Sequence, residues 1–154
     1  MDYLEEKAYI FGSIFTLSNK LQSLGDRFDH NLTIKQWLLL ASIFKCDSDS
    51  PTISEVAALI GNSRQNVKKM ILILEKEGFV SLIKDSNDAR ILRVRFTKNC
   101  QDYLLQREKK ESEFLLKLFE EFNSSEIELL VKSISKLGKN ISQMESLYNY
   151  EEEE

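Results

Sequence analysis

The chain of 154 residues has few of the residues that make tight turns or bind metals. It contains five glycines, one proline, two cysteines and one histidine, whereas glycine and proline usually make up about 7% and 5% of a protein. This scarcity excludes a β-sandwich, a collagen-like repeat and a Pro-rich linker, and it favours long helices. No apolar run approaches the ~18 residues that span a bilayer, and no export signal is visible. We therefore expect a cytoplasmic protein with no membrane segment and no disulfide framework.

No motif typical of catalysis is evident in the sequence. There is no glycine-rich phosphate loop and no pair of metal ligands, and the single histidine, His30, lies in a predicted loop near Asp26 and Asp29. A histidine without cysteine partners makes a weak metal site. Cys46 and Cys100 have no evident cationic partner that would activate a thiol. We expect no enzyme activity, no metal and no cofactor.

Charge is unevenly distributed along the chain, whose net charge is −4. Residues 51–98 hold nine basic and five acidic residues, a net charge of +4, while the remaining residues hold twelve and twenty, a net charge of −8. A basic middle between acidic flanks is typical of a phosphate-facing module on an acidic scaffold. Chance clustering of surface lysines is the alternative.

Apolar periodicity and capping motifs predict a mainly α-helical fold. Capping boxes at Thr33-x-x-Gln36, Thr52-x-x-Glu55 and Ser125-x-x-Glu128 predict three helix starts, and Gly25 is expected to end the first helix. The predicted helices cover about 3–24, 33–46, 52–60, 63–77 and 97–122, with a last one from 125 and an acidic tail at 151–154. The β-rich runs 79–84 and 91–96 flank the turn-rich segment 85–90 and predict a hairpin with two arginines, Arg93 and Arg95, on one face. Helix, turn, helix and hairpin in this order predict a winged helix-turn-helix.

Helix 63–77 has the side chains that read DNA. An α-helix is about 10–12 Å across and fits the ~12 Å major groove with its first turn against the base edges. Ser63 is a natural N-cap, and the exposed first turns offer Arg64, Gln65, Asn66, Lys68 and Lys69. At the hairpin tip Arg90 can reach a minor groove, with Asp88 two residues away to orient it, and Arg93 on the hairpin is a further predicted DNA-binding residue. A merely solvated basic face is the alternative.

The segments SEVAALIGNSRQNVKKMILILEKEGFV and DARILRVRFT resemble the MarR family of bacterial transcriptional regulators, and the resemblance extends over nearly the whole chain. It implies a homodimer that binds a palindromic double-stranded DNA operator, with helix 63–77 in the major groove and the wing in the minor groove. The family's Asp-x-Arg wing motif falls on Asp88 and Arg90. Its recognition-helix contacts fall on Ser63, Arg64, Gln65, Asn66, Lys68 and Lys69.

The terminal helices carry apolar stripes that a small winged domain cannot bury. The first helix repeats Ile10, Ile14, Leu17, Leu21 and Leu24, and the last has a seam at Ile127, Leu130, Ile134, Leu137, Ile141, Met144 and Tyr148. We expect residues 1–30 and 98–150 to form a helical dimerisation region and residues 31–97 to form the DNA-binding lobe. A purely intrachain helical bundle is the alternative.

Many members of the family respond to small aromatic or lipophilic ligands held between these two regions. The resemblance therefore suggests a pocket lined by Phe11, Phe15, Trp37 and Phe44, which would otherwise be ordinary core. A rival function is a winged-helix dimer that binds a protein partner and has lost specific DNA binding. Leu82 supports this rival, because many members have an arginine at that strand position.

Overall fold

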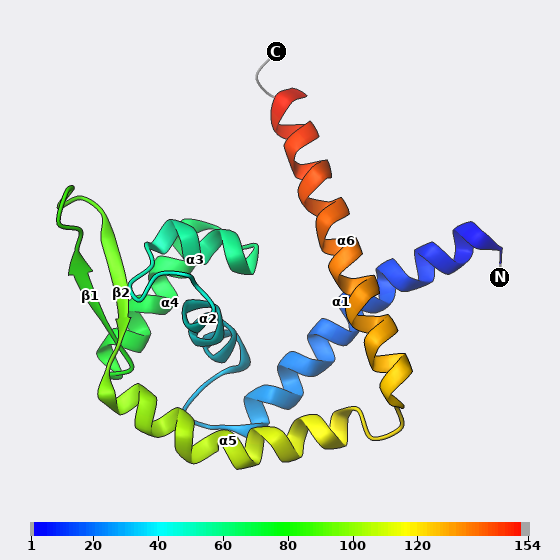
Figure 1. Cartoon of the computed structure of the whole chain (residues 1–154), viewed down its shortest axis with the longest axis horizontal. Coiled ribbons are helices and arrows are strands. Elements are labelled where there is room, and N and C mark those ends of the chain that lie inside the picture. Colours follow the sequence, from blue (N-terminus) through cyan, green and yellow to red (C-terminus); the bar gives the residue numbers. More distant parts are fainter. Residues whose placement is uncertain (1, 152–154) are drawn as a thin grey trace. The chain divides into compact units, whose positions relative to one another are not determined.

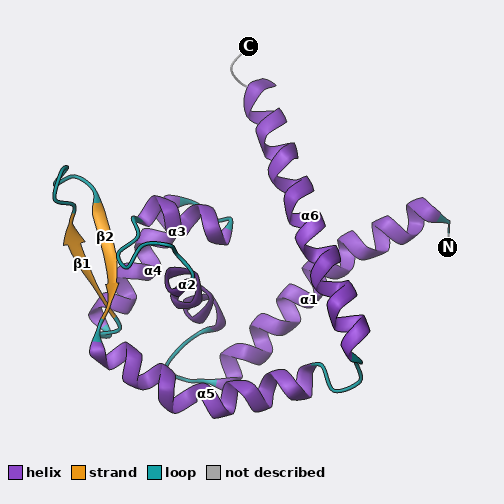
Figure 2. Cartoon of the chain, in the orientation of Figure 1, coloured by secondary structure: helices purple, strands orange, loops and turns teal. Residues whose placement is uncertain are grey.

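The structure, a computed structural model, describes the backbone of residues 2–151 and the side chains of residues 2–147. In chain order its elements are α1 (Tyr3–Phe28), α2 (Ile34–Phe44), α3 (Ile53–Ile60), α4 (Arg64–Lys76), β1 (Val80–Lys84), β2 (Leu92–Phe96), α5 (Lys98–Leu118) and α6 (Ser124–Glu151) (Figures 1 and 2). The chain divides into two compact units, residues 1–105 and 106–154. Within the described residues no helix is long and apolar enough to cross a membrane.

The first unit contains the predicted winged helix-turn-helix, which is confirmed. α3 and α4 are joined by a short turn in which Gly61 has a φ of +61°, a backbone conformation that favours glycine. β1 and β2 then pair as an antiparallel hairpin, with Val80 opposite Phe96 and Lys84 opposite Leu92. The core beneath them is apolar and includes Leu39, Leu40, Val56, Val67, Ile71, Leu74 and Val94. Figure 1 shows the hairpin projecting beside α3 and α4.

Two of the three predicted capping boxes are confirmed, and the third is wrong by two residues. The side chains of Thr33 and Thr52 each cap their helix reciprocally with the residue three positions later. The last helix begins at Ser124 and is instead capped by Asn123, whose side chain accepts the Glu126 N–H at 3.1 Å, while the Glu126 carboxylate accepts the Asn123 N–H at 2.8 Å. Asparagine is as good an N-cap as serine. α5 correspondingly ends at Leu118, earlier than the predicted residue 122.

The prediction that Gly25 ends the first helix is also wrong, since α1 continues to Phe28. Gly25 is buried, and a Cβ atom at this position would lie only 2.8 Å from Cδ1 and 2.9 Å from Cβ of Ile34. The next residue, Asp26, accepts the backbone N–H of Ile34 at 2.8 Å through its carboxylate. Gly25 therefore permits the close packing of α1 against the start of α2.

Large apolar side chains are exposed along α1 and α6, each considered within the single chain. On α1 they include Tyr9, Ile10, Phe11, Ile14, Phe15, Leu17, Leu21 and Leu24. On α6 they include Leu129, Leu130, Val131, Ile134, Leu137, Ile141, Met144 and Leu147. The side chain of Tyr148 and the tail residues 152–154 lie outside the described part, whereas Glu151 is the last residue of α6. Rows of exposed apolar side chains are typical of faces that another element or chain covers.

Candidate nucleic-acid interface

The N-terminal end of α4 presents a polar, basic surface. Ser63 caps the helix, and its hydroxyl accepts the Asn66 N–H at 3.2 Å. On the inner side of the helix, Val67, Ile71 and Leu74 are completely buried. Five other side chains of the first two turns are exposed, and they are Arg64, Gln65, Asn66, Lys68 and Lys69. All the residues predicted to read DNA from this helix lie on its open face.

The turn before α4 restricts how this surface is presented. The carboxamide oxygen of Asn62 accepts the Ser63 N–H at 2.8 Å and the Asn66 side-chain amide at 3.3 Å. Asn62 thus orients Asn66, a role that is not among the predictions made from the sequence. An asparagine just before an N-cap serine is a signal that could have revealed this role.

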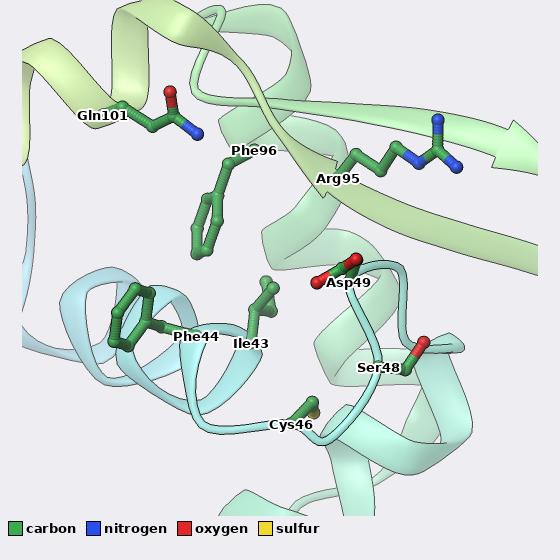
Figure 3. Close-up of a pocket in the computed structure, with 8 residues that line it drawn as sticks. All are labelled: Ile43, Phe44, Cys46, Ser48, Asp49, Arg95, Phe96 and Gln101. Atoms are coloured by element: carbon green, nitrogen blue, oxygen red, sulfur yellow. The ribbon is translucent and has the colours of Figure 1, made fainter.

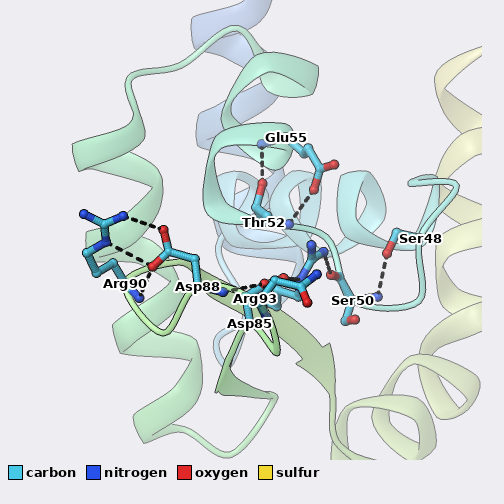
Figure 4. A network of polar contacts seen from close by, with 9 residues as sticks. Ser48, Ser50, Thr52, Glu55, Asp85, Asp88, Arg90 and Arg93 are labelled. Carbon is cyan, nitrogen blue, oxygen red and sulfur yellow. Dashed lines mark hydrogen bonds and ion pairs between the residues drawn. The ribbon is translucent and has the colours of Figure 1, made fainter.

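The hairpin tip carries a second cation, Arg90, whose side chain is 91% exposed. Its guanidinium donates two hydrogen bonds to Asp88, from Nε to Oδ1 at 3.0 Å and from Nη2 to Oδ2 at 2.9 Å (Figure 4). The bonds from Arg90 hold the pKa of the Asp88 carboxyl below its ordinary value, and the pKa of Arg90 is raised in return. Asp88 and Arg90, predicted as a pair from their spacing, are brought together.

Arg93 is in a different environment, since its side chain is only 30% exposed. Its Nε–H donates to Oδ2 of Asp85 at 2.5 Å, and its Nη1–H donates to the backbone carbonyl of Ser50 at 2.8 Å (Figure 4). Two strand positions further on, Arg95 is exposed. The two arginines predicted to share one face of the hairpin thus have different surroundings.

Asp85 is the centre of the polar network at the tip. Besides Arg93, its carboxylate accepts the backbone N–H groups of Asn87 at 2.8 Å and Asp88 at 3.1 Å. The hydrogen bond from Arg93, followed by these two amide bonds, lowers the pKa of Asp85. The sequence predicts only that Asp85 lies in the turn between the two strands. An aspartate two residues before an asparagine at the start of a hairpin loop is the local signal of this arrangement.

Of the four residues predicted to line a ligand pocket, Phe44 borders a pocket in the described structure. Phe44 is 78% exposed and borders a pocket of about 450 Å³, lined by Ile43, Phe44, Cys46, Ser48, Asp49, Arg95, Phe96 and Gln101. In Figure 3 the ring of Phe96 points from the end of β2 toward α2. Phe11 and Phe15 form an exposed edge-to-face pair on α1, with ring centroids 5.1 Å apart. Trp37 packs against the core of the first unit.

Both cysteine thiols are in environments that disfavour the thiolate. Burial raises the pKa of Cys100 to about 11. At Cys46, burial and then the negative charges of Glu55 and Asp47 raise the thiol pKa. Among the described residues, no group of three or more His, Cys, Asp or Glu side chains is arranged to hold a metal ion.

Comparison with known proteins gives a consistent result. Residues 32–92 match the family model described as MarR family. Similar solved structures include a MarR/EmrR family transcriptional regulator from an Acinetobacter species, with 18% identity over 89% of this chain and 97% of that one, at a TM-score of 0.77. The transcriptional regulator BldR from Sulfolobus solfataricus has 17% identity over 91% and 99% of the two chains, at a TM-score of 0.78. A mutant MarR from E. coli complexed with operator DNA has 18% identity over 89% and 99%, at a TM-score of 0.75.

Proposed function

Residues 32–92 match the MarR family model, and from this match we propose that the chain is a dimeric, sequence-specific DNA-binding regulator of transcription. One observation carries the proposal. The first two turns of α4 expose five hydrogen-bonding or cationic side chains, while the opposite side of the same turns is completely buried at Val67 and Ile71. Such a helix is fixed in the lobe by one face and free to enter a groove with the other.

Each exposed side chain in the first two turns of α4 suits a particular feature of duplex DNA. The carboxamides of Gln65 and Asn66 can bond an adenine edge through two hydrogen bonds, and the cations Arg64, Lys68 and Lys69 suit guanine edges or phosphates. The Ser63 hydroxyl lies at the helix N-terminus, where backbone N–H groups attract a phosphate. We propose that the N-terminal end of α4 lies in the major groove.

The hairpin is assigned the adjacent minor groove or its phosphates. Arg90 extends almost wholly into solvent, and its pairing with Asp88 restricts the directions in which the guanidinium can point. The family's Asp-x-Arg motif falls on the same two residues. Arg90 therefore adds affinity that depends little on base sequence.

A second copy of the chain explains the exposed apolar faces of α1 and α6. We propose residues 31–97 as the DNA-binding lobe and residues 1–30 with 98–150 as the dimerisation region. A two-fold dimer would place two α4 helices about 34 Å apart, one turn of DNA, on a palindromic operator. The similar E. coli MarR structure contains operator DNA, which supports operator binding for this chain. A protein with this function would act in the cytoplasm, where the bacterial chromosome lies.

We further propose repression modulated by a small aromatic or lipophilic ligand. The pocket beside Phe44 includes Ser48 and Asp49, and the next residue, Ser50, holds Arg93 of the hairpin through its carbonyl. A ligand that displaced this loop would disturb the wing. Phe11, Phe15 and Trp37 remain predicted ligand contacts.

The dependence of binding on salt tests the function directly. The probe is duplex DNA from upstream of the protein's own gene, and the readout is fluorescence anisotropy. A binder making about 6–10 phosphate contacts should lose about 10³–10⁵ in affinity between 50 and 200 mM salt. An apolar protein-interaction module would show no such loss, and absence of salt-dependent binding would contradict the proposal.

A further inference from the structure

The side chain of Arg93 joins two segments that are far apart in the sequence. Its guanidinium donates to Asp85 at the start of the hairpin loop and to the carbonyl of Ser50, just before α3. The backbone of β2 is anchored at the same place, because the Val94 N–H donates to the Pro51 carbonyl at 2.9 Å. Arg93 therefore fixes the hairpin loop to the body of the lobe.

Hydrogen bonds within the hairpin loop connect Arg93 to Arg90. The Asp85 carboxylate bonded to Arg93 also accepts the backbone N–H of Asp88. The Asp88 carboxylate in turn accepts the backbone N–H of Arg90 at 3.0 Å and both prongs of its guanidinium. Hydrogen bonds thus connect Ser50, Arg93, Asp85, Asp88 and Arg90 in this order (Figure 4).

We propose that Arg93 is a positioning residue that orients Arg90 for DNA, and that it does not itself contact DNA. This inference rests on the proposed function. A guanidinium occupied by a carboxylate and a carbonyl has less of its charge and fewer of its donors available for phosphate. Arginine is required here because its planar fork bonds two acceptors in different directions, whereas a lysine ammonium is a single point charge.

Arg95 provides a matched control on the same strand. It has the same charge and lies two positions away, and its exposed side chain makes no hydrogen bond or ion pair within the described part of the chain. Replacing either residue by Met removes one positive charge and retains an unbranched side chain. Only the replacement at position 93 breaks the chain of bonds to Arg90.

The experiment is a double-mutant cycle on the full-length chain, with affinity for the duplex upstream of its own gene measured by anisotropy. We expect Arg90→Ala and Arg93→Met each to weaken binding by about tenfold. The double variant should be no weaker than Arg90→Ala alone, since Arg93 acts only through Arg90. Arg93→Lys should behave like Arg93→Met, whereas Arg95→Met should change affinity by less than about threefold.

Two results would overturn the proposal. The first is additive losses in the double variant, with a further decrease of about one in the salt slope, which identifies Arg93 as a phosphate contact. The second is full rescue by Arg93→Lys, which shows that charge alone matters. If wild type shows no salt-dependent DNA binding, the proposed function fails instead.

Amide hydrogen exchange tests the same inference without DNA. The N–H groups of Asn87 and Asp88 are held by the carboxylate that Arg93 orients. We expect faster exchange at these amides in Arg93→Met than in Arg95→Met, while the core of the lobe remains protected as in wild type. Unchanged exchange at the hairpin tip would contradict the positioning role, and general loss of protection would identify Arg93 as a residue needed for folding only.

Discussion

The carboxylate of Glu75, near the end of α4, accepts the backbone N–H of Leu82 in β1 at 2.9 Å. β1 is an edge strand of the hairpin, and the outward-facing N–H groups of an edge strand have no partner strand. Glu75 supplies one such partner and so links α4 to β1. Leu82 occupies the strand position where many MarR-family proteins have an arginine. Its side chain has no charge, but its backbone is tied to the lobe by the hydrogen bond to Glu75.

We expect Glu75→Ala to lower the free energy of unfolding by about 1–2 kcal/mol, because the Leu82 amide loses its acceptor in a half-buried place. DNA affinity should fall as well, since the angle between α4 and the wing is less well fixed. Glu77→Ala is the matched control, because Glu77 is exposed at the end of the same helix. Equal stability and affinity in the two variants, measured by urea denaturation and anisotropy, would contradict this role.

Substitutions at two glycines of α1 should have opposite effects. A helical Gly→Ala change normally stabilises by about 1 kcal/mol. At Gly25 the new Cβ would lie under 3.0 Å from three atoms of Ile34, and such overpacking destabilises by about 1–3 kcal/mol. Gly12 has no heavy atom within 4 Å of a new Cβ and serves as the control. Thermal unfolding should show Gly25→Ala melting below wild type and Gly12→Ala melting at or above it.

The structural features that could be predicted from the sequence are mostly those formed by residues close together in the chain. The capping boxes at Thr33 and Thr52 were readable because each joins residues three positions apart. The packing role of Gly25 was not readable, because it depends on Ile34 across a helix junction. The surroundings of Arg93 were hidden for the same reason, since its partners lie 8 and 43 residues away. Strand alternation places an arginine on a face, but it does not reveal what that face contacts.

The thiols should be slow to react with iodoacetamide, because alkylation requires the thiolate. With a pKa of about 11, Cys100 has roughly a thousandth of its molecules ionised at pH 8. Cys46 should react more slowly than a free cysteine, and its rate should rise with pH. Mass spectrometry after native labelling should therefore find Cys100 unmodified until the protein is unfolded in urea. Rapid native labelling of Cys100 would contradict the described burial.

The proposed dimer predicts a specific effect of charge on the α6 seam. Ile134 is exposed within the single chain and lies in the middle of the apolar seam. Ile134→Glu should shift the protein from dimer to monomer in light scattering after gel filtration, because a carboxylate in an apolar interface is left unpaired. Lys136→Glu, on the opposite side of the same helix turn, should leave the dimer intact. Identical masses for both variants would point to an intrachain bundle.

The central claim is that side chains in the first two turns of α4 contact the DNA bases. The most direct test is to measure affinity for a set of operator duplexes that differ by single base pairs. Wild type, Gln65→Ala and Arg90→Ala would be compared by anisotropy at one salt concentration. We expect Gln65→Ala to lose about 1–3 kcal/mol of discrimination at one base pair in each half-site, and Arg90→Ala to weaken binding to every duplex by a similar factor. If both variants bind every duplex as wild type does, α4 and the wing do not contact DNA as proposed.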